Sequence, residues 1–221
     1  MNSRGNRRFD FILGIMKCIV SPQSLFKSVL EKPNLTKATS LILVIAVVAA
    51  WASFNYMSKL PLTSLLQQEG GGMFPEQGQL MIASVVMTLV GVFGTWFTSS
   101  ALIHGFAKVL KGNGAFNNIL ILAGYASMPL LIQQLLRLVD SFIVSPEGAL
   151  QIVGFLVSAG PLLNPIASAA AHILTIFRLW SIVLLVIAVR ENYKVSMARS
   201  TVVTILSFTA VLFISTFLPL M

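Results

Sequence analysis

Five long apolar stretches alternate along the chain with shorter segments that carry most of its charged residues. The hydrocarbon core of a bilayer is about 30 Å thick, and a helix needs about 20 apolar residues to cross it. The five stretches reach that length at about residues 38–57, 80–107, 116–139, 166–189 and 201–219. The pattern predicts an all-α polytopic membrane protein with five transmembrane helices.

The composition excludes a soluble protein of this size. The chain has 221 residues, of which 56% are hydrophobic and 10% are charged, whereas a soluble domain carries about 25% charged residues. So few charges cannot cover the surface of a soluble domain. The net charge of +8 does not indicate nucleic acid as a partner, because the cations flank apolar stretches, where they set orientation and meet anionic lipid headgroups.

Lys and Arg are distributed unequally between the two sides of the predicted bundle. With five crossings, twelve of the fifteen fall on one side, namely Arg4, Arg7, Arg8, Lys17, Lys27, Lys32, Lys37, Lys108, Lys111, Arg190, Lys194 and Arg199. The opposite loops hold Lys59 with Glu69, Glu76 and Glu147. Because cytoplasmic loops carry the excess of positive charge, we expect the N-terminus in the cytoplasm and the C-terminus outside.

The segment before the first stretch predicts a cytoplasmic platform. Residues 1–8 are polar and basic, and we expect them to be disordered. Residues 9–33 contain two short amphipathic helices, the first at 9–20 and the second starting at Ser21 and Pro22, an N-cap followed by proline. Neither is long enough to span, so we expect a pair of interfacial helices. Packing on the inner surface of the bundle is the alternative.

Small residues form a stripe along one face of the second stretch. Their spacing alternates between three and four, and they are Gly91, Gly94, Thr98, Ala101 and Gly105. Lipid tails are as apolar as the side chains of a membrane helix, so close approach of small residues is what favours association of helices there. The stripe therefore predicts a helix-packing face.

Pro129 interrupts the third stretch, and we expect it to kink the helix because proline has no backbone N–H. The freed carbonyl near Tyr125 then needs a donor, which Ser127 or a neighbouring span would supply.

Arg178 is the most unusual residue of the apolar stretches. It precedes Arg190 by about 18 Å of helix, which places it near the middle of the bilayer. An arginine there costs about 2.5–3.5 kcal/mol and is expected to face the bundle interior. With it we group the other polar residues of the third and fourth stretches as a candidate intramembrane polar site: His172, Thr175, Gln133, Gln134, Arg137 and Asp140.

Two expectations concern the charges of this polar site. Arg137 and Asp140 are three residues apart, so we expect them to form a local ion pair near the outer interface. For Arg178, three roles remain open. It acts as a structural polar clamp to carbonyls, glutamines or water, it lines a polar cavity or substrate path, or it meets an acidic residue of a partner protein.

The sequence lacks the common catalytic and metal-binding motifs. Cys18 has no second cysteine with which to form a disulfide. His104 and His172 fall near opposite faces of the membrane, so they cannot share a metal, and Ser168 one turn from His172 lacks an orienting acid. We expect a protein that is not an enzyme, with no catalytic residue, cofactor or metal.

Several segments resemble the Yip1-domain family of membrane proteins. These are Pro22-x3-Phe26-x6-Pro33, the glycine-containing second stretch, Lys111-Gly-Asn-Gly-Ala-Phe116, Gly124-Tyr-Ala-Ser-Met-Pro129, and Trp180 with Ala188-Val-Arg-Glu-Asn-Tyr-Lys-Val-Ser196. Gly124, Tyr125 and Pro129 are similar to the family's central signature. The resemblance covers roughly residues 20–220, makes 38–219 the Yip1-like membrane domain, and implies five spans with a cytoplasmic N-terminus.

Function follows from the resemblance only by analogy. Eukaryotic relatives associate with Rab GTPases in ER–Golgi traffic and carry a longer N-terminal cytoplasmic region, so this chain looks more like a prokaryotic member, placed in the cell membrane. Some bacterial members accompany an ABC-type exporter as an accessory subunit.

Two functions are therefore carried forward. The first is a non-enzymatic scaffold, accessory subunit or membrane-organising factor. Its partners are anionic lipid headgroups and another membrane protein or a second copy of this chain. The alternative is a small transporter or lipid-handling protein that uses the polar site around Arg178.

Overall fold

The structure is a computed structural model that describes residues 20–60, 77–146, 148 and 165–217, with the side chains of 165–175 and 215–217 left out. Within these ranges the chain is helical, and they contain no strand. The helices are α2 (Pro22–Glu31), α3 (Leu35–Ser58), α5 (Gln77–Val109), α6 (Phe116–Ala126), α7 (Met128–Ile143), α9 (Pro165–Tyr193) and α10 (Met197–Phe217). The all-α class is confirmed.

Four described segments are long and apolar enough to cross a membrane, namely Leu35–Ser58, Gln77–Val109, Phe116–Ile143 and Met197–Ile214. The third of them is α6 and α7 taken together. The expected fifth crossing is α9, which has 29 residues. Since the side chains of 165–175 are not described, its crossing stays a prediction. The expected tail 1–8 lies outside the described residues, and so does the expected first amphipathic helix 9–20 apart from residue 20.

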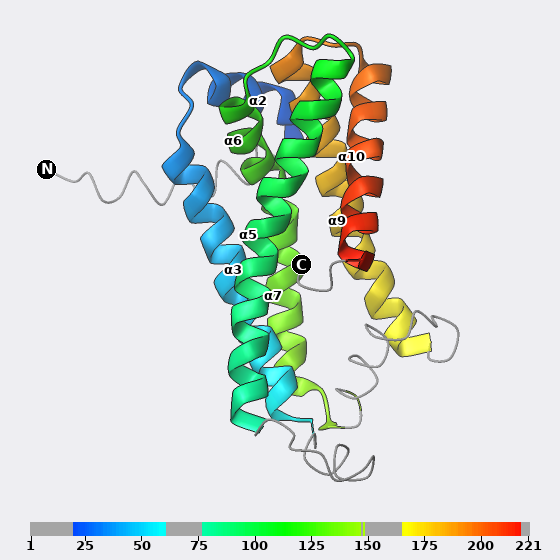
Figure 1. Cartoon of the computed structure of the whole chain (residues 1–221). Coiled ribbons are helices and arrows are strands. Elements are labelled where there is room, and N and C mark those ends of the chain that lie inside the picture. The colour runs from blue at the N-terminus through cyan, green and yellow to red at the C-terminus, as the bar shows by residue number, and fades with distance from the viewer. Residues whose placement is uncertain (1–19, 61–76, 147, 149–164, 218–221) are drawn as a thin grey trace, which may run out of the picture.

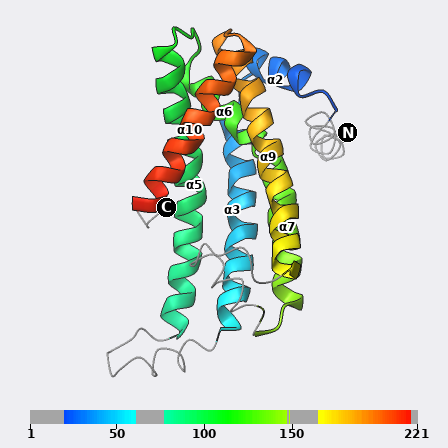
Figure 2. The ribbon, with the colours of Figure 1, turned by 90° about the vertical axis from the view of Figure 1, so that its right-hand side faces the viewer.

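The bundle has two ends, which we name by their residues. The basic end holds α2, the turn 110–115 and the turn 194–196, and the distal end holds the C-termini of α3 and α7 (Figure 1). Helix α3 packs against α5, α6 and α7, while α9 packs against α6, α7 and α10. Helix α10 starts at the basic end and stops short of the distal end (Figures 1 and 2).

The core surrounds α6, the short helix beside the basic end. Residues 119–124 of α6 are buried without interruption, as expected for a helix that is apolar on all sides. Helix α3 contributes Leu41, Ile42 and Ile45 to the same core. A Cβ atom added to Gly124 would lie 2.9 Å from Cβ of Ala38. Gly124, part of the predicted family signature, therefore allows α6 and α3 to approach this closely.

Helix α2 packs on the bundle, which is the alternative left open for this segment. Its apolar residues Leu25, Phe26 and Val29 are buried, and its neighbours are α9 and α6. Phe26 is completely buried. The opposite side of α2 carries exposed polar groups such as Lys27. The helix is thus an anchored part of the basic end.

The path from α6 to α7 breaks at Ser127, two residues before Pro129. Ser127 Oγ donates to the carbonyl of Ala123 at 2.9 Å. Ser181 Oγ, from α9, donates to the carbonyl of Ala126 at 2.8 Å. The predicted interruption is observed, and both expected kinds of donor are present. The carbonyls that they reach are those of Ala123 and Ala126.

Candidate functional site

Arg178 lies at the edge of the bundle, and the prediction that it faces the interior is wrong. Its side chain is exposed, and it forms no hydrogen bond or ion pair with any other described residue. The face that α9 buries here contains Ser181, Leu184 and Ala188. Arg178 falls beside that face rather than on it. The described residues therefore offer no polar clamp around Arg178.

Arg137 is the arginine that lies on an inward face. Its side chain is half-buried, and it shares one side of α7 with the buried residues Gln133 and Ser141. Helices α7 and α9 are neighbours, and Arg137 and Arg178 are close enough to repel each other electrostatically. The structure thus places two predicted site residues of the same charge on neighbouring helices.

Asp140 does not form the predicted ion pair with Arg137. The pair Glu191–Lys194, at 3.9 Å, is the ion pair found among the described residues. Asp140 instead accepts a hydrogen bond from the hydroxyl of Tyr56, at 2.5 Å from Oδ2. The same hydroxyl lies 3.2 Å from the carbonyl oxygen of Arg137. Because the buried Tyr56 belongs to α3, Asp140 bonds across to another helix rather than along its own.

Further contacts fasten α3 to α7 at the distal end. Asn55 Nδ2 donates to Ser141 Oγ at 3.3 Å. Lys59 Nζ donates to the carbonyls of Phe142 and Val144, at 3.0 and 2.7 Å. We call Asn55, Tyr56, Lys59, Asp140 and Ser141 the distal network. Sequence reasoning missed it, although polar residues in the last turns of two neighbouring apolar segments were a signal for it.

Two glutamines of α7 carry amide oxygens without partners. The Oε1 atoms of Gln133 and Gln134 are buried and accept no hydrogen bond, and Gln133 is 1% exposed. An unpartnered buried acceptor costs about 1–3 kcal/mol. Two such atoms one turn from Arg137 make this stretch of α7 a candidate for binding a ligand with donor groups. His172 and Thr175 lie where the side chains are not described.

The predicted small-residue stripe of α5 is not a continuous buried face. Ala101 and Gly105 are exposed, and a Cβ atom on Gly105 would meet nothing within 4 Å. Gly91, Gly94 and Thr98 are half-buried. Near the basic end α5 buries a different set, namely Ser100, Ile103 and Ala107. The stripe prediction is therefore wrong for its last two members within this chain.

The turn after α5 has an ordered backbone. Lys111 has a positive φ of 61°. The N–H of Gly112 donates to the carbonyl of Ala107 at 2.8 Å, and the N–H of Lys111 donates to the carbonyl of Lys108 at 3.0 Å. These bonds form a Schellman motif, in which the residue past the helix end adopts the left-handed conformation. The motif turns the chain sharply toward α6.

Tyr193 joins this turn to the end of α9. The tyrosine is 1% exposed, and its hydroxyl lies 2.7 Å from His104 Nδ1. Its carbonyl accepts from the N–H of Asn113 at 3.2 Å, and Asn192 Nδ2 donates to the carbonyl of Ala115 at 3.1 Å. We call these five residues the tyrosine clasp. It brings together segments 111–116 and 188–196, which carried the resemblance.

Exposed cations cover the basic end. They are Lys27, Lys32, Lys37, Lys108, Lys111, Arg190, Lys194 and Arg199. The described acidic residues of this end are Glu31, which is exposed, and Glu191, which is buried and paired with Lys194. This surface therefore suits an anionic partner.

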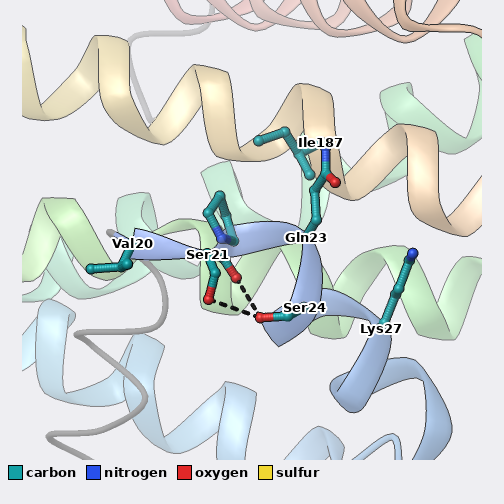
Figure 3. A pocket seen from close by; sticks show the side chains of 7 residues that line it. Val20, Ser21, Gln23, Ser24, Lys27 and Ile187 are labelled. Atoms are coloured by element: carbon teal, nitrogen blue, oxygen red, sulfur yellow. Dashed lines mark hydrogen bonds between the residues drawn. The ribbon is translucent and has the colours of Figure 1, made fainter.

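A cavity of about 450 Å³ opens between the start of α2 and α9 (Figure 3). Its lining combines Ser21, Ser24 and Lys27 with the apolar Val20 and Ile187. Ser24 Oγ donates to the carbonyl of Ser21 at 2.8 Å, so its donor is already used. Within the described ranges, no three His, Cys, Asp or Glu side chains lie together. The described cationic groups suit anionic ligands rather than metal ions.

These features define a class, the polytopic α-helical membrane proteins. The Yip1 domain model matches residues 16–218, so the chain belongs to the Yip1-domain family. It is also similar to the uncharacterized protein MJ0794 of Methanocaldococcus jannaschii, with 22% identity over 133 residues that cover 58% of this chain and 87% of that protein. An archaeal relative fits a prokaryotic-type member. No solved structure matches the chain.

Proposed function

We propose that this Yip1-domain protein is a non-enzymatic scaffold or accessory subunit of a prokaryotic cell membrane, with its N-terminus in the cytoplasm and its C-terminus outside. Its basic end binds an acidic cytoplasmic surface of another membrane protein and lies against anionic lipid headgroups. The membrane subunit of an ABC-type exporter is one candidate partner, by family resemblance. A second copy of the chain is another.

The observation that supports this function is the ordered, cationic basic end. Helix α2 is anchored there by Phe26, and the tyrosine clasp holds the neighbouring turn against α9. The exposed lysines and arginines of α2 and of this turn therefore extend from an ordered backbone. A positive surface steers association with a negatively charged partner. An ordered backbone lowers the cost of binding, because less loop ordering is needed.

Affinity purification from the native host in a mild detergent, followed by mass spectrometry, tests the proposal. We expect a membrane protein in stoichiometric amounts with the wild-type chain and its loss with the double variant Lys27→Glu, Arg199→Glu. The control is Gln79→Glu, which adds a negative charge at an exposed position of the distal end and leaves the partner bound. A preparation that contains this chain and lipid, with no partner in any variant, would overturn the scaffold role.

The presence of Arg137 and Arg178 on the neighbouring helices α7 and α9 favours a second candidate function. It is that of a small transporter or lipid-handling protein with a polar intramembrane site around Arg178. Polar residues at this depth commonly mark ion or substrate paths. Liposomes that contain the purified protein test this function by flux of anions or of fluorescent phospholipid. We expect flux that Arg178→Leu abolishes. Equal flux in protein-free liposomes would rule the function out.

A further inference from the structure

The positions of Arg137 and Arg178 along the bundle axis follow from one interhelical hydrogen bond. Helices α7 and α9 run antiparallel side by side (Figures 1 and 2), and the Ser181–Ala126 bond fixes their register. Counted from that bond toward the distal end, Arg178 comes after one turn of α9 and Arg137 after about three turns of α6 and α7. Their Cα atoms are thus separated by about 12 Å along the bundle axis.

Helix geometry directs the two side chains toward each other across this interval. Side chains of a helix lean toward its N-terminus. In an antiparallel pair, Arg137 therefore leans toward the basic end and Arg178 toward the distal end. Arg178 is among the charges that act on the guanidinium of Arg137, which agrees with this direction. Two guanidinium groups of like charge consequently flank one stretch of the α7–α9 boundary.

The described protein neutralises this stretch only in part. Asp140 attracts Arg137 electrostatically, but its carboxylate accepts from Tyr56 and lies farther toward the distal end. Arg178 has no hydrogen bond or ion pair among the described residues. Gln133 and Gln134, whose buried Oε1 atoms lack donors, lie one turn from Arg137 on the side toward Arg178. The stretch therefore offers two cations and two free acceptors.

We propose that Arg137 and Arg178 bind the phosphate of a ligand at the α7–α9 boundary, while Gln133 and Gln134 accept hydrogen bonds from its hydroxyl groups. Arginine suits phosphate because its planar guanidinium forms paired hydrogen bonds with two oxygens. The exposure of Arg178 leaves the site open at the side of the bundle, where a lipid would enter. Phosphatidylglycerol and free inorganic phosphate both carry the required chemistry, and the test separates them.

This inference deepens the second candidate function by naming its ligand, and its test requires neither flux nor a partner protein. The full-length protein is purified in a neutral detergent. Thermal unfolding and native mass spectrometry then follow its binding of phosphatidylglycerol, phosphatidylcholine with the same acyl chains, and inorganic phosphate. We expect phosphatidylglycerol to raise the unfolding temperature and phosphatidylcholine to leave it unchanged.

The variants Arg137→Gln and Arg178→Gln are expected to weaken phosphatidylglycerol binding about tenfold each, as for a lost charged hydrogen bond. Arg190→Gln, which removes the same charge from an exposed position at the basic end, should weaken binding less than about twofold, because seven other cations of that surface remain to meet the headgroups. Because Arg178 is exposed, Arg178→Gln should unfold at the wild-type temperature without ligand, which separates lost binding from lost folding.

If inorganic phosphate stabilises the wild-type protein but neither Arg137→Gln nor Arg178→Gln, the result would support the site and identify its ligand as a soluble phosphate. Two results would overturn the proposal. One is the absence of binding by either phosphate source. The other is an equal loss of binding in Arg190→Gln, which would indicate unspecific attraction to positive charge.

Discussion

Gly114 sets how closely the turn 110–115 approaches the end of α9. A Cβ atom at this position would lie 2.6 Å from Cδ1 of Tyr193 and 2.8 Å from the carbonyl oxygen of Asn192. The second of these neighbours is backbone and cannot rotate away. The glycine is therefore needed for close packing, and any side chain here would disturb the tyrosine clasp.

We predict that Gly114→Ala lowers the free energy of unfolding by about 1–3 kcal/mol, the usual cost of overpacking. The matched control is Gly105→Ala, because a Cβ atom there meets nothing within 4 Å. This control should raise stability slightly, since alanine favours a helix over glycine by about 1 kcal/mol. Thermal unfolding in detergent, followed by tryptophan fluorescence, measures both. Equal effects of the two substitutions would contradict the packing role of Gly114.

The bond between Tyr56 and Asp140 makes a second prediction for single residues. Tyr56→Phe and Asp140→Asn each remove or weaken it, and each should destabilise the protein by about 1–3 kcal/mol, as expected for a hydrogen bond to a charged group. A double-mutant cycle isolates the interaction. We expect a coupling energy of about 1 kcal/mol or more, whereas additive effects would show that the bond does not stabilise the bundle.

At the scale of the helices, the break at Ser127 shows what a sequence can predict. Proline has no N–H, so the interruption follows from Pro129 itself, and the need for a donor follows from the low dielectric of the membrane. The identity of the donor does not follow from the sequence, because Ser181 is 55 positions away from Ala126 along the chain. Only the packing of α9 against α6 brings it to the carbonyl of Ala126.

Removal of the Ser181 hydroxyl should destabilise the α6–α9 contact. We predict that Ser181→Ala lowers stability by about 1 kcal/mol, in the range measured for hydrogen bonds between membrane helices. Ser24→Ala is the control, because Ser24 is exposed and bonds within its own turn. Its effect should stay within about 0.5 kcal/mol. Chemical unfolding in mixed micelles compares the two, and a larger loss for Ser24→Ala would contradict the assignment.

The errors at this scale share one physical cause. The cost of charge in a bilayer predicts that Arg178 faces the interior, and the tendency of small residues to pack predicts a contact at the end of the α5 stripe. Both rules state that a residue needs a neighbour, and neither says which molecule supplies it. Arg178 and Gly105 are exposed in the chain, so a lipid, a ligand or a second copy remains the available neighbour.

For the whole molecule, charge was the most reliable signal. The loops predicted to share one side of the membrane lie at one end of the bundle, where α2, the turn 110–115 and the turn 194–196 meet (Figure 1). The tyrosine clasp and the distal network could not be predicted in the same way. Each depends on pairs that are far apart in sequence, such as His104 with Tyr193 and Tyr56 with Asp140.

The proposed partner binding requires that the basic end face the cytoplasm. Site-directed cysteine labelling tests this directly. In a Cys18→Ser background, Asn113→Cys places a thiol at the exposed turn of the basic end and Ser145→Cys places one at the exposed distal end.

A membrane-impermeant maleimide is then applied to cells with an intact plasma membrane and to permeabilised cells. We expect Ser145→Cys to be labelled in both, and Asn113→Cys only after permeabilisation. Labelling of Asn113→Cys in intact cells, with protection of Ser145→Cys, would invert the protein in the membrane and contradict the account.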